Sequence, residues 1–442
     1  MRSTVILDAE VAGRTTDIRI IDDVVDEIGV LRPGPEELVI EARGGALLPG
    51  LHDHHLHLLA LAAASASVRC GPSDVDGIDR LARTLRSAPG WWVRGVGYHE
   101  SVAGILDRYA LDRLVPDRPV RIQHRGGALW MLNSLALQEL RMQEEFEDGL
   151  LWRHDDLLRE RLGEHTAPDL AAVGRRLAAL GITGVTDATP NLSQGAVDLL
   201  ARAELPQRVH LLGAPSDAEL FDGQTVGPWK ILHSDHEPPD WESLYEEVRR
   251  VHATGRPVAI HAVTRESLVL ALAVLAEAGP LRGDRIEHAS VLGSDAVPLL
   301  VESGATVITQ PGFVTERERE YRCGVVESEH EDLYRYGSLL RAGVQVAPSS
   351  DAPYASEDPW RTIAAAATRN LAPTERVAPQ RVLAGLLAPL GEPGGNPRRV
   401  TVGESADLCL LAVPLGEALD APDAAMVVTA ICAGDVQNEA LL

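Results

Sequence analysis

Lysine is nearly missing from this chain of 442 residues. Of its 41 basic residues, 40 are arginine, and Lys230 is the only lysine. Acidic residues number 65, so the formal net charge is −24. Nucleic acids and anionic membranes are bound by clusters of basic side chains. The charge balance therefore predicts no nucleic-acid partner and no membrane partner.

Cysteines and long apolar runs are also scarce. The four cysteines, Cys70, Cys323, Cys409 and Cys432, lie far apart, which argues against a disulfide framework or a cysteine metal site. No apolar run approaches the roughly 20 residues that span a bilayer. Asp8 interrupts the first apolar stretch too early for a signal peptide. We therefore expect a cytoplasmic protein.

The middle of the sequence repeats one pattern of helix, glycine and short strand. The copies span residues 181–187, 255–261, 304–310 and 343–351, with a looser one at 279–288. Glycine suits the left-handed position after a helix, and short strands that alternate with helices indicate a parallel sheet. In the helix before residue 255, Leu244, Val248 and Val251 form the stripe predicted to face the core.

Polar residues able to bind metal stand at the predicted strand ends. The eight candidate ends are His55/His57, His124, Asp187, Lys230, His261, His288, Gln310 and Asp351. In a closed (β/α)8 barrel, the C-terminal strand ends form the active-site face. We therefore predict an α/β fold with a TIM-like (β/α)8 barrel over residues 49–396. The strand at 119–124 has the weakest pattern of the eight.

The two chain ends are predicted to meet in a second, smaller domain. Short strands are expected at residues 4–11 and 17–22 and again at 407–413 and 426–433. Neither end has enough strands for a stable sheet by itself. We therefore predict one composite β-sandwich built from residues 1–48 and 397–442.

The segment Pro49–His57 carries the first chemical signal. Side chains alternate across a strand, so Asp53, His55 and His57 share one face, and two imidazoles spaced in this way can bind a divalent cation. His52 and His54 fall on the other face and are expected to be structural. By itself this pair of histidines is weak evidence for a metal site, because histidines in strands are often structural.

The later strand ends strengthen the metal hypothesis. Lys230, His261, His288 and Asp351 each close a predicted strand. Burying so many ionisable groups at one barrel mouth is costly without a counter-ion, which a bound cation provides.

This ordered set resembles the amidohydrolase superfamily, and most closely a metal-dependent hydrolase branch that includes N-substituted formamide deformylases (amidohydrolase family 3-like). The segments that carry the resemblance are 48–57, 114–120, 133–134, 181–187, 228–230, 259–261, 285–288, 350–353 and 403–408. Many relatives have an Asp-Gly-His segment where this chain reads His124-Arg-Gly-Gly. Whether His124 or Arg125 replaces the histidine of that segment is open.

The resemblance implies a set of metal ligands. His55 and His57 would bind a more buried ion, and His261 and His288 a more exposed one. CO₂ would convert Lys230 to a carbamate that bridges both ions, which an arginine could not do. Asp351 would bind metal and the attacking water. We expect one or two divalent ions, with zinc as the expected metal. Asp53 would orient a ligand histidine without binding the metal.

The function expected is metal-dependent hydrolysis of an amide-type C–N bond in a small molecule. Metal-bound hydroxide would attack the carbonyl, with Asp351 as general base and then general acid. Ester or lactone hydrolysis and deamination are the alternatives within the superfamily. Deamination is disfavoured because related deaminases carry a glutamate where this chain has Thr264. A non-catalytic, metal-bound barrel that acts as a binding protein is the alternative from another class.

Five further side chains stand on predicted active-face loops as candidates for substrate contact, each with packing or loop structure as the alternative. They are Tyr98, His99, Arg125, Trp229 and Gln310. The sequence leaves the substrate, the metal and a homo-oligomeric state open.

Overall fold

The computed structural model describes residues 2–72, 74–163, 169–233 and 239–438. It divides into two compact units. Unit 1 comprises residues 1–58 and 170–442, and unit 2 comprises residues 59–169. Unit 2 is therefore one continuous insertion in the chain of unit 1.

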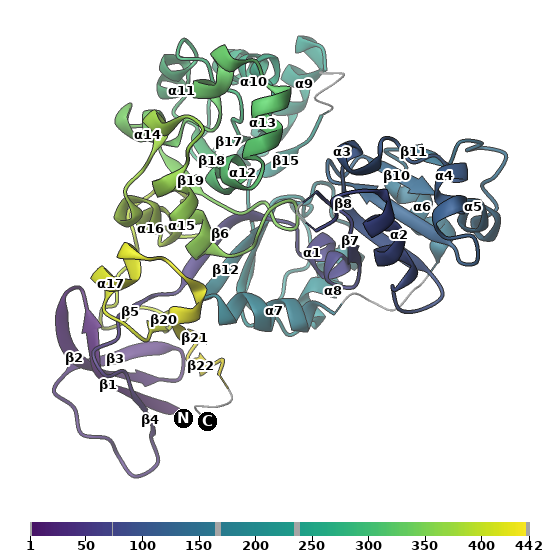
Figure 1. The fold of residues 1–442 in the computed structure, drawn as a ribbon. Coiled ribbons are helices and arrows are strands. Elements are labelled where there is room, and N and C mark those ends of the chain that lie inside the picture. The colour runs from purple at the N-terminus through teal and green to yellow at the C-terminus, as the bar shows by residue number, and fades with distance from the viewer. Residues whose placement is uncertain (1, 73, 164–168, 234–238, 439–442) are drawn as a thin grey trace. The chain divides into compact units, whose positions relative to one another are not determined.

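Parallel strands make up the two main sheets of unit 1 (Figure 1). One sheet has the order β14-β13-β12-β6 and the other β15-β16-β17-β18-β19. The strands are β6 (Leu51–Leu56), β12 (Ile182–Asp187), β13 (Arg208–Leu211), β14 (Gln224–Val226), β15 (Trp229–Ile231), β16 (Val258–Ala262), β17 (Arg285–His288), β18 (Thr306–Thr309) and β19 (Val346–Pro348). Every residue of β6, β12, β17 and β18 is buried, as expected for parallel strands covered on both faces.

Backbone hydrogen bonds join these two sheets at two places. The Lys230 N–H donates to the carbonyl of Leu212, just after β13, over 3.2 Å. Between the edge strands β19 and β6, the Asp351 N–H, just after β19, donates to the His55 carbonyl over 2.8 Å. The strand ends that carry His55, Lys230 and Asp351 therefore belong to one hydrogen-bonded framework.

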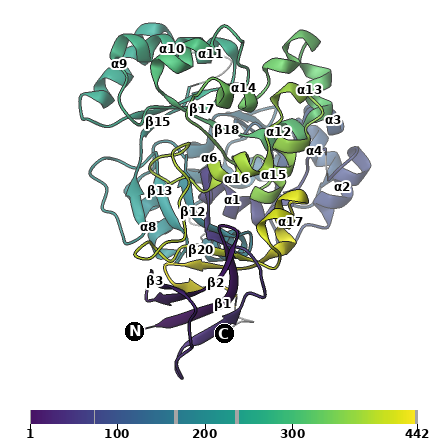
Figure 2. The same ribbon diagram turned by 90° about the vertical axis from the view of Figure 1, so that its left-hand side faces the viewer.

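The helices of unit 1 lie between the parallel strands or follow them along the chain. They are α7 (Leu170–Ala179), α8 (Gln194–Arg202), α9 (Trp241–His252), α10 (Arg265–Ala278), α11 (Val297–Ser303), α12 (Pro311–Glu316), α13 (Glu318–Gly324), α14 (Tyr336–Arg341), α15 (Pro359–Thr368), α16 (Pro379–Leu386) and α17 (Leu415–Asp420). Figure 2 shows α9, α10 and α11 beside β15, β17 and β18. Helix α9 buries Leu244, Val248 and Val251, which confirms the predicted apolar stripe.

The two chain ends supply two further sheets of unit 1, with the orders β3-β2-β1-β4 and β22-β21-β20-β5. Their strands are β1 (Ser3–Val11), β2 (Arg14–Ile21), β3 (Val24–Gly29), β4 (Leu38–Glu41), β5 (Leu47–Pro49), β20 (Leu408–Leu411), β21 (Val427–Cys432) and β22 (Asp435–Val436). Residues of both sheets, among them Ile18 and Leu410, share one hydrophobic core. The four strands expected at the chain ends are therefore present as β1, β2, β20 and β21.

Unit 2 has its own five-stranded sheet with the order β11-β10-β9-β8-β7. Its strands are β7 (Val68–Arg69), β8 (Val93–Tyr98), β9 (Val120–His124), β10 (Leu129–Leu132) and β11 (Leu150–Trp152). The helices that follow Leu58 are α1 (Leu58–Ser65), α2 (Ile78–Arg86), α3 (Glu100–Ala103), α4 (Arg108–Leu114), α5 (Ser134–Leu140) and α6 (Asp155–Leu162). Leu81 of α2 and Leu111 of α4 pack in one core with Val93 and Ile122 of the sheet.

One predicted strand pairs elsewhere than expected. The strand at 119–124 exists as β9, but β9 pairs with β8 and β10 of unit 2. The prediction of this segment as a strand of the barrel was wrong, because local strand propensity does not specify which strands pair. Among the described residues, no helix is long and apolar enough to cross a membrane.

Candidate functional site

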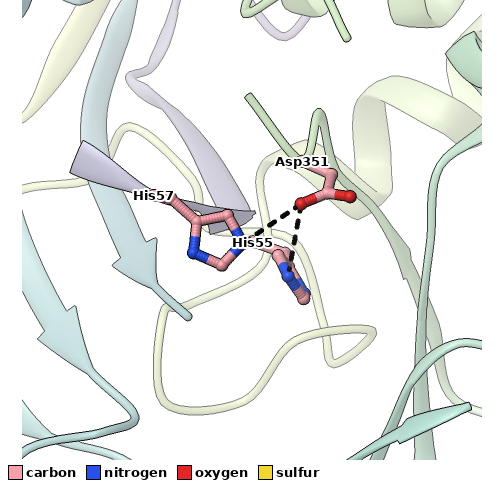
Figure 3. A group of neighbouring side chains, drawn as sticks. All are labelled: His55, His57 and Asp351. Atoms are coloured by element: carbon pink, nitrogen blue, oxygen red, sulfur yellow. Dashed lines mark ion pairs between the residues drawn. The ribbon is translucent and has the colours of Figure 1, made fainter. Parts of the chain in front are cut away.

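Three predicted metal ligands of unit 1 come together at the end of β6. The Asp351 Oδ1 lies 3.5 Å from His55 Nε2 and 3.3 Å from His57 Nε2 (Figure 3). His55 and His57 are two residues apart, so the alternation of the strand directs both imidazoles to one side. The ligand atoms of the three residues lie within 4.8 Å of one another, close enough to hold one metal ion.

Two further histidines extend this group across the second parallel sheet. The His288 ring lies 4.8 Å from the His55 ring and 4.6 Å from the His261 ring, between centroids. His261 is the penultimate residue of β16 and His288 is the last residue of β17, and these strands are hydrogen-bonded neighbours. All four imidazoles therefore form one continuous cluster.

Fixed contacts hold the Nδ1 atoms of three of these imidazoles. His55 Nδ1 pairs with the Glu287 carboxylate. His57 Nδ1 lies 3.2 Å from the Thr189 hydroxyl, and His288 Nδ1 donates to Gln310 Oε1 over 2.9 Å. The carboxylate and amide oxygens can only accept, so they place the proton of His55 and His288 on Nδ1, and all three contacts leave Nε2 available as a metal ligand.

Glu287 is a residue of this site that the sequence reasoning missed. Its carboxylate is fully buried and contacts both His55 and the Arg285 guanidinium, whose Nε lies 2.6 Å away. Burial alone raises the pKa of Glu287, but Arg285, His55 and Lys230 together hold it well below its usual value. A signal did exist, because Arg285 and Glu287 share one face of a strand in the motif Arg-Ile-Glu-His288.

Lys230 is buried next to these charges. Its side chain is 3% exposed, and its Nζ has no hydrogen-bond partner among the residues that the structure describes. Burial lowers the pKa of Lys230 to about 8, although Glu287 and Asp351 oppose this shift. A measurable fraction of the amine is therefore neutral near pH 7.

The remaining ionisable groups differ in charge state. Burial raises the pKa of Asp351, but the close contact with His57 and the charges of nearby histidines outweigh it and keep the pKa below its usual value. Burial, followed by the Lys230 charge, lowers the pKa of His55 to about 4. An ionised Asp351 and a neutral His55 are the forms that bind metal.

Asp53 holds the backbone of the site. Its Oδ1 accepts from the His55 N–H over 3.1 Å and from the Ser350 N–H over 3.2 Å. It thereby ties β6 to the residue before Asp351. Burial raises the pKa of Asp53 to about 6.

His52 and His54 bind backbone carbonyls. His52 Nδ1 lies 2.8 Å from the Ala388 carbonyl oxygen, and His54 Nε2 lies 3.1 Å from that of Gly385. Both side chains are buried. These contacts confirm the prediction that the two histidines are structural.

Two of the predicted substrate contacts lie in unit 1. Gln310 is fully buried and uses both ends of its amide, on His288 and on the Ser349 hydroxyl. Its position is that of a residue that orients a ligand histidine. Trp229 is half-buried, and the Arg256 guanidinium lies over its ring at 5.1 Å.

The other three predicted substrate contacts, Tyr98, His99 and Arg125, lie in unit 2. Tyr98 is 1% exposed within the core, and its hydroxyl donates to the Gly104 carbonyl over 2.5 Å. His99 Nε2 lies 3.4 Å from the Glu100 carboxylate, which also contacts His124 at 3.0 Å. Arg125 is half-buried, and its N–H donates to the Tyr98 carbonyl over 2.8 Å.

His99, Glu100 and His124 form a second group with metal-ligand spacing. The Nδ1 atoms of both histidines accept backbone N–H groups, from Ser101 over 3.2 Å and from Gly126 over 3.1 Å. A neutral imidazole with an acceptor at Nδ1 carries its proton on Nε2. Both Nε2 atoms are therefore donors to Glu100 in this arrangement, which disfavours a metal at this position.

The fold and the site together define an α/β protein with a candidate divalent-metal centre at the ends of parallel strands. The sequence profile Amidohydro_3, described as amidohydrolase family, matches residues 38–386. The chain therefore belongs to the amidohydrolase family, which makes it an enzyme of the hydrolase class.

Several known proteins are similar to this chain. It is 24% identical over 401 residues to a Bacillus subtilis (strain 168) protein that carries the name amidohydrolase YtcJ, covering 76% of this chain and 75% of the relative. It is 22% identical over 418 residues to N-substituted formamide deformylase of Arthrobacter pascens, covering 75% of this chain and 76% of the relative. The crystal structure of an uncharacterized metal-dependent hydrolase from Pyrococcus horikoshii OT3 superposes with a TM-score of 0.73 at 19% identity, covering 93% of this chain and 97% of that one.

Proposed function

We propose that this enzyme is a metal-dependent hydrolase that cleaves an amide-type C–N bond of a small molecule. One observation carries the proposal. His55 Nε2, Lys230 Nζ and Asp351 Oδ1 are buried, and none has a hydrogen-bond partner among the described residues. Buried polar atoms without partners are costly and rare, so three in one cluster indicate a ligand that they share.

A divalent cation fits this cluster. Imidazole nitrogens and a carboxylate oxygen are ligands that zinc accepts, and the Nδ1 contacts already described orient His55 and His57 for binding through Nε2. We propose that these two histidines and Asp351 hold the first ion. A second ion would be held by His261 and His288. Zinc is the proposed metal.

We further propose that Lys230 is carboxylated and bridges the two ions. The neutral amine nitrogen forms a bond to the carbon of CO₂ and releases one proton, which gives a carbamate with two oxygens and one negative charge. The lowered pKa of Lys230 makes the neutral amine available. The modification would also replace a buried positive charge that lacks a hydrogen-bond partner with a metal ligand. This requirement explains why one lysine persists among 40 arginines.

Bound divalent cations lower the pKa of water and polarise a carbonyl group. Asp351 supplies the proton transfer in the proposed reaction. Its Oδ1 faces His55 and His57, and its Oδ2 lies 3.9 Å from His288 Nδ1. We assign the mobile proton to Oδ2, which would take it from the attacking water and deliver it to the leaving nitrogen. Glu287, Thr189 and Gln310 hold the imidazoles in place.

N-substituted formamides are the first substrates to test, because a formamide deformylase is among the relatives. Ester and lactone hydrolysis stay as alternatives, since the same groups could cleave those bonds. Deamination is less favoured. Thr264 stands where related deaminases carry a glutamate, and its side chain caps α10 by accepting the Ser267 N–H over 3.1 Å. A non-catalytic binding protein would retain metal without turnover.

The proposed architecture is a (β/α)8 barrel over residues 49–396, with a composite β-sandwich from 1–48 and 397–442. The hydrogen bonds that join the two parallel sheets support the barrel, and the shared terminal core supports the sandwich. We also propose a small-molecule substrate, a cytoplasmic location and no nucleic-acid or membrane partner.

The test is a hydrolysis screen of zinc-loaded enzyme with N-formyl, N-acyl, cyclic-amide and lactone compounds. Release of formate or free amine should depend on added metal and fall by at least about 10³-fold in Asp351→Asn, given the loss of both base and acid. Asp240→Asn removes an exposed carboxylate from the start of α9 and serves as the matched control. Faster cleavage of lactones than of amides would overturn the C–N assignment. Metal binding without any turnover would support the non-catalytic alternative.

A further inference from the structure

One face of the sheet in unit 2 carries three arginines. Arg94 on β8 and Arg121 on β9 are direct partners in the parallel register. Val93, Val120 and Ile122, which alternate with them, point into the core, so both arginines point to the opposite side. Arg69 on β7 is exposed and lies on the same side, because its neighbour Val68 packs against the core. We call Arg69, Arg94 and Arg121 the arginine face.

Arg121 is an anomaly within this face. It is only half exposed, and its guanidinium makes no hydrogen bond or ion pair with any residue that the structure describes. Its contacts are two indole rings, with centroids 5.9 Å away in Trp92 and 5.6 Å away in Trp130. Burial, and then the nearby charge of Arg94, lower the pKa of Arg121 to about 10.

The surroundings of Arg121 add positive charge. The Arg94 guanidinium lies 5.5 Å from the Trp130 centroid on the same face, and its Nη1 donates to the Ser67 hydroxyl over 3.2 Å. Like charges on neighbouring strands destabilise a sheet. The chain as a whole has a formal charge of −24, so two neighbouring arginines with Arg69 beside them run against the overall charge. Stacking on indole rings relieves part of the desolvation of a guanidinium, but it provides no counter-ion.

We propose that the arginine face is a binding site for a small oxyanion, a carboxylate or a phosphate, held by the Arg121 guanidinium between Trp92 and Trp130. A guanidinium presents a planar pair of N–H groups that matches the two oxygens of such an anion. The Trp130 indole is fixed by its own hydrogen bond to Asp155 over 2.8 Å, so it offers a rigid wall beside the anion. The site is separate from the metal cluster in sequence and does not depend on the proposed function.

Equilibrium dialysis of the full-length, metal-loaded protein tests this site, with radiolabelled benzoate and radiolabelled inorganic phosphate as two separate probes at low ionic strength. Anions can also bind at the metal centre, so the informative quantity is the difference between variants. We expect wild type to bind one anion per chain more than Arg121→Gln. Arg121→Lys keeps the charge but loses the planar pair of donors, and we expect roughly tenfold weaker binding at this site. Arg113→Gln removes an exposed positive charge from α4 of the same unit and should bind like wild type.

The two probes identify the source of the anion. Tighter binding of benzoate indicates that the indole walls select an aryl or alkyl carboxylate, and tighter binding of phosphate indicates a phosphate or phosphate ester. Equal stoichiometry in wild type and Arg121→Gln for both probes overturns the proposal. So does an equal loss in Arg113→Gln, because it would reflect the net charge of unit 2 alone. Near-ultraviolet circular dichroism checks the packing of the tryptophans, and if Arg121→Gln does not fold, the comparison with Arg121→Lys decides.

Discussion

Glu287 is the residue of the candidate site whose replacement gives the sharpest test of how the site is held together. Glu287→Gln preserves the shape of the side chain and removes its charge. The carboxylate now contacts the Arg285 guanidinium and His55 Nδ1, and both residues of the Arg285–Glu287 pair are at most 1% exposed. The substitution therefore leaves Arg285 buried with a neutral partner.

Glu287→Gln should lower both the stability of the protein and its affinity for zinc. Breaking a buried ion pair by removing one charge costs about 3–5 kcal/mol. We expect the lower end, about 3 kcal/mol, because the glutamine oxygen still accepts one hydrogen bond. Loss of a carboxylate behind a ligand histidine weakens metal binding by roughly 10–100-fold, which corresponds to about 1.4–2.7 kcal/mol.

Two assays measure these effects separately. Urea unfolding of the metal-free protein gives the loss of stability, and competition with a chelator gives the zinc affinity. Glu247→Gln is the matched control, since Glu247 pairs with His233 over 3.1 Å at 27% exposure, where a pair contributes under about 1 kcal/mol. It should leave the zinc affinity unchanged.

A double-mutant cycle with Arg285→Met checks the cause. If most of the lost stability comes from the buried Arg285 guanidinium without its carboxylate partner, the double variant should lose less stability than the sum of the two single variants. Zinc affinity within about twofold of wild type in Glu287→Gln, or strict additivity in the cycle, would refute this account of the site.

Three further predictions concern single residues. Lys230→Arg should reduce the zinc content from two ions per chain to one and abolish most activity, as measured by elemental analysis and turnover; full activity would contradict the carbamate. Asp351→Asn should retain the circular dichroism spectrum of wild type and lose turnover, and normal turnover would remove Asp351 from the proton transfer. The pKa of His210 is lowered from 6.5 to about 4 by burial and then by nearby arginines, so the unfolded chain protonates first and stability falls as pH drops from 6.5 to 4. His210→Asn should make the free energy of unfolding fall by about 3 kcal/mol less over this pH range, as measured by urea unfolding at each pH. An unchanged pH dependence of stability would contradict the lowered pKa of His210.

The parts of the structure that the sequence predicted are those with a local cause. The strands that carry His55, Lys230, His261 and His288 as their last or penultimate residue could be placed because each combines a short β-rich segment with a polar residue near its end. The alternation of β6 also separated His55 and His57 from the structural pair His52 and His54. Local periodicity is enough to assign faces within one strand.

The errors and omissions have a non-local cause. The strand at 119–124 has ordinary strand propensity, and only its pairing with β8 and β10 shows that it belongs to unit 2. Glu287 was overlooked because its role depends on His55, which lies 232 residues away in the chain. Tyr98 was predicted to face substrate, but the core of unit 2 buries it and Gly104 accepts its hydroxyl.

By itself, the sequence determined which chemistry this protein has available: imidazoles and a carboxylate at strand ends and one amine among arginines. These follow from residue type and from the two-residue repeat of a strand, which operate over a few positions. Only the tertiary structure decided which of these groups meet, which nitrogen of His55, His57 and His288 is left for a ligand, and that Arg121 has no counter-ion among the described residues. Such features depend on strand pairing and burial between residues far apart in the chain, and no local pattern encodes them.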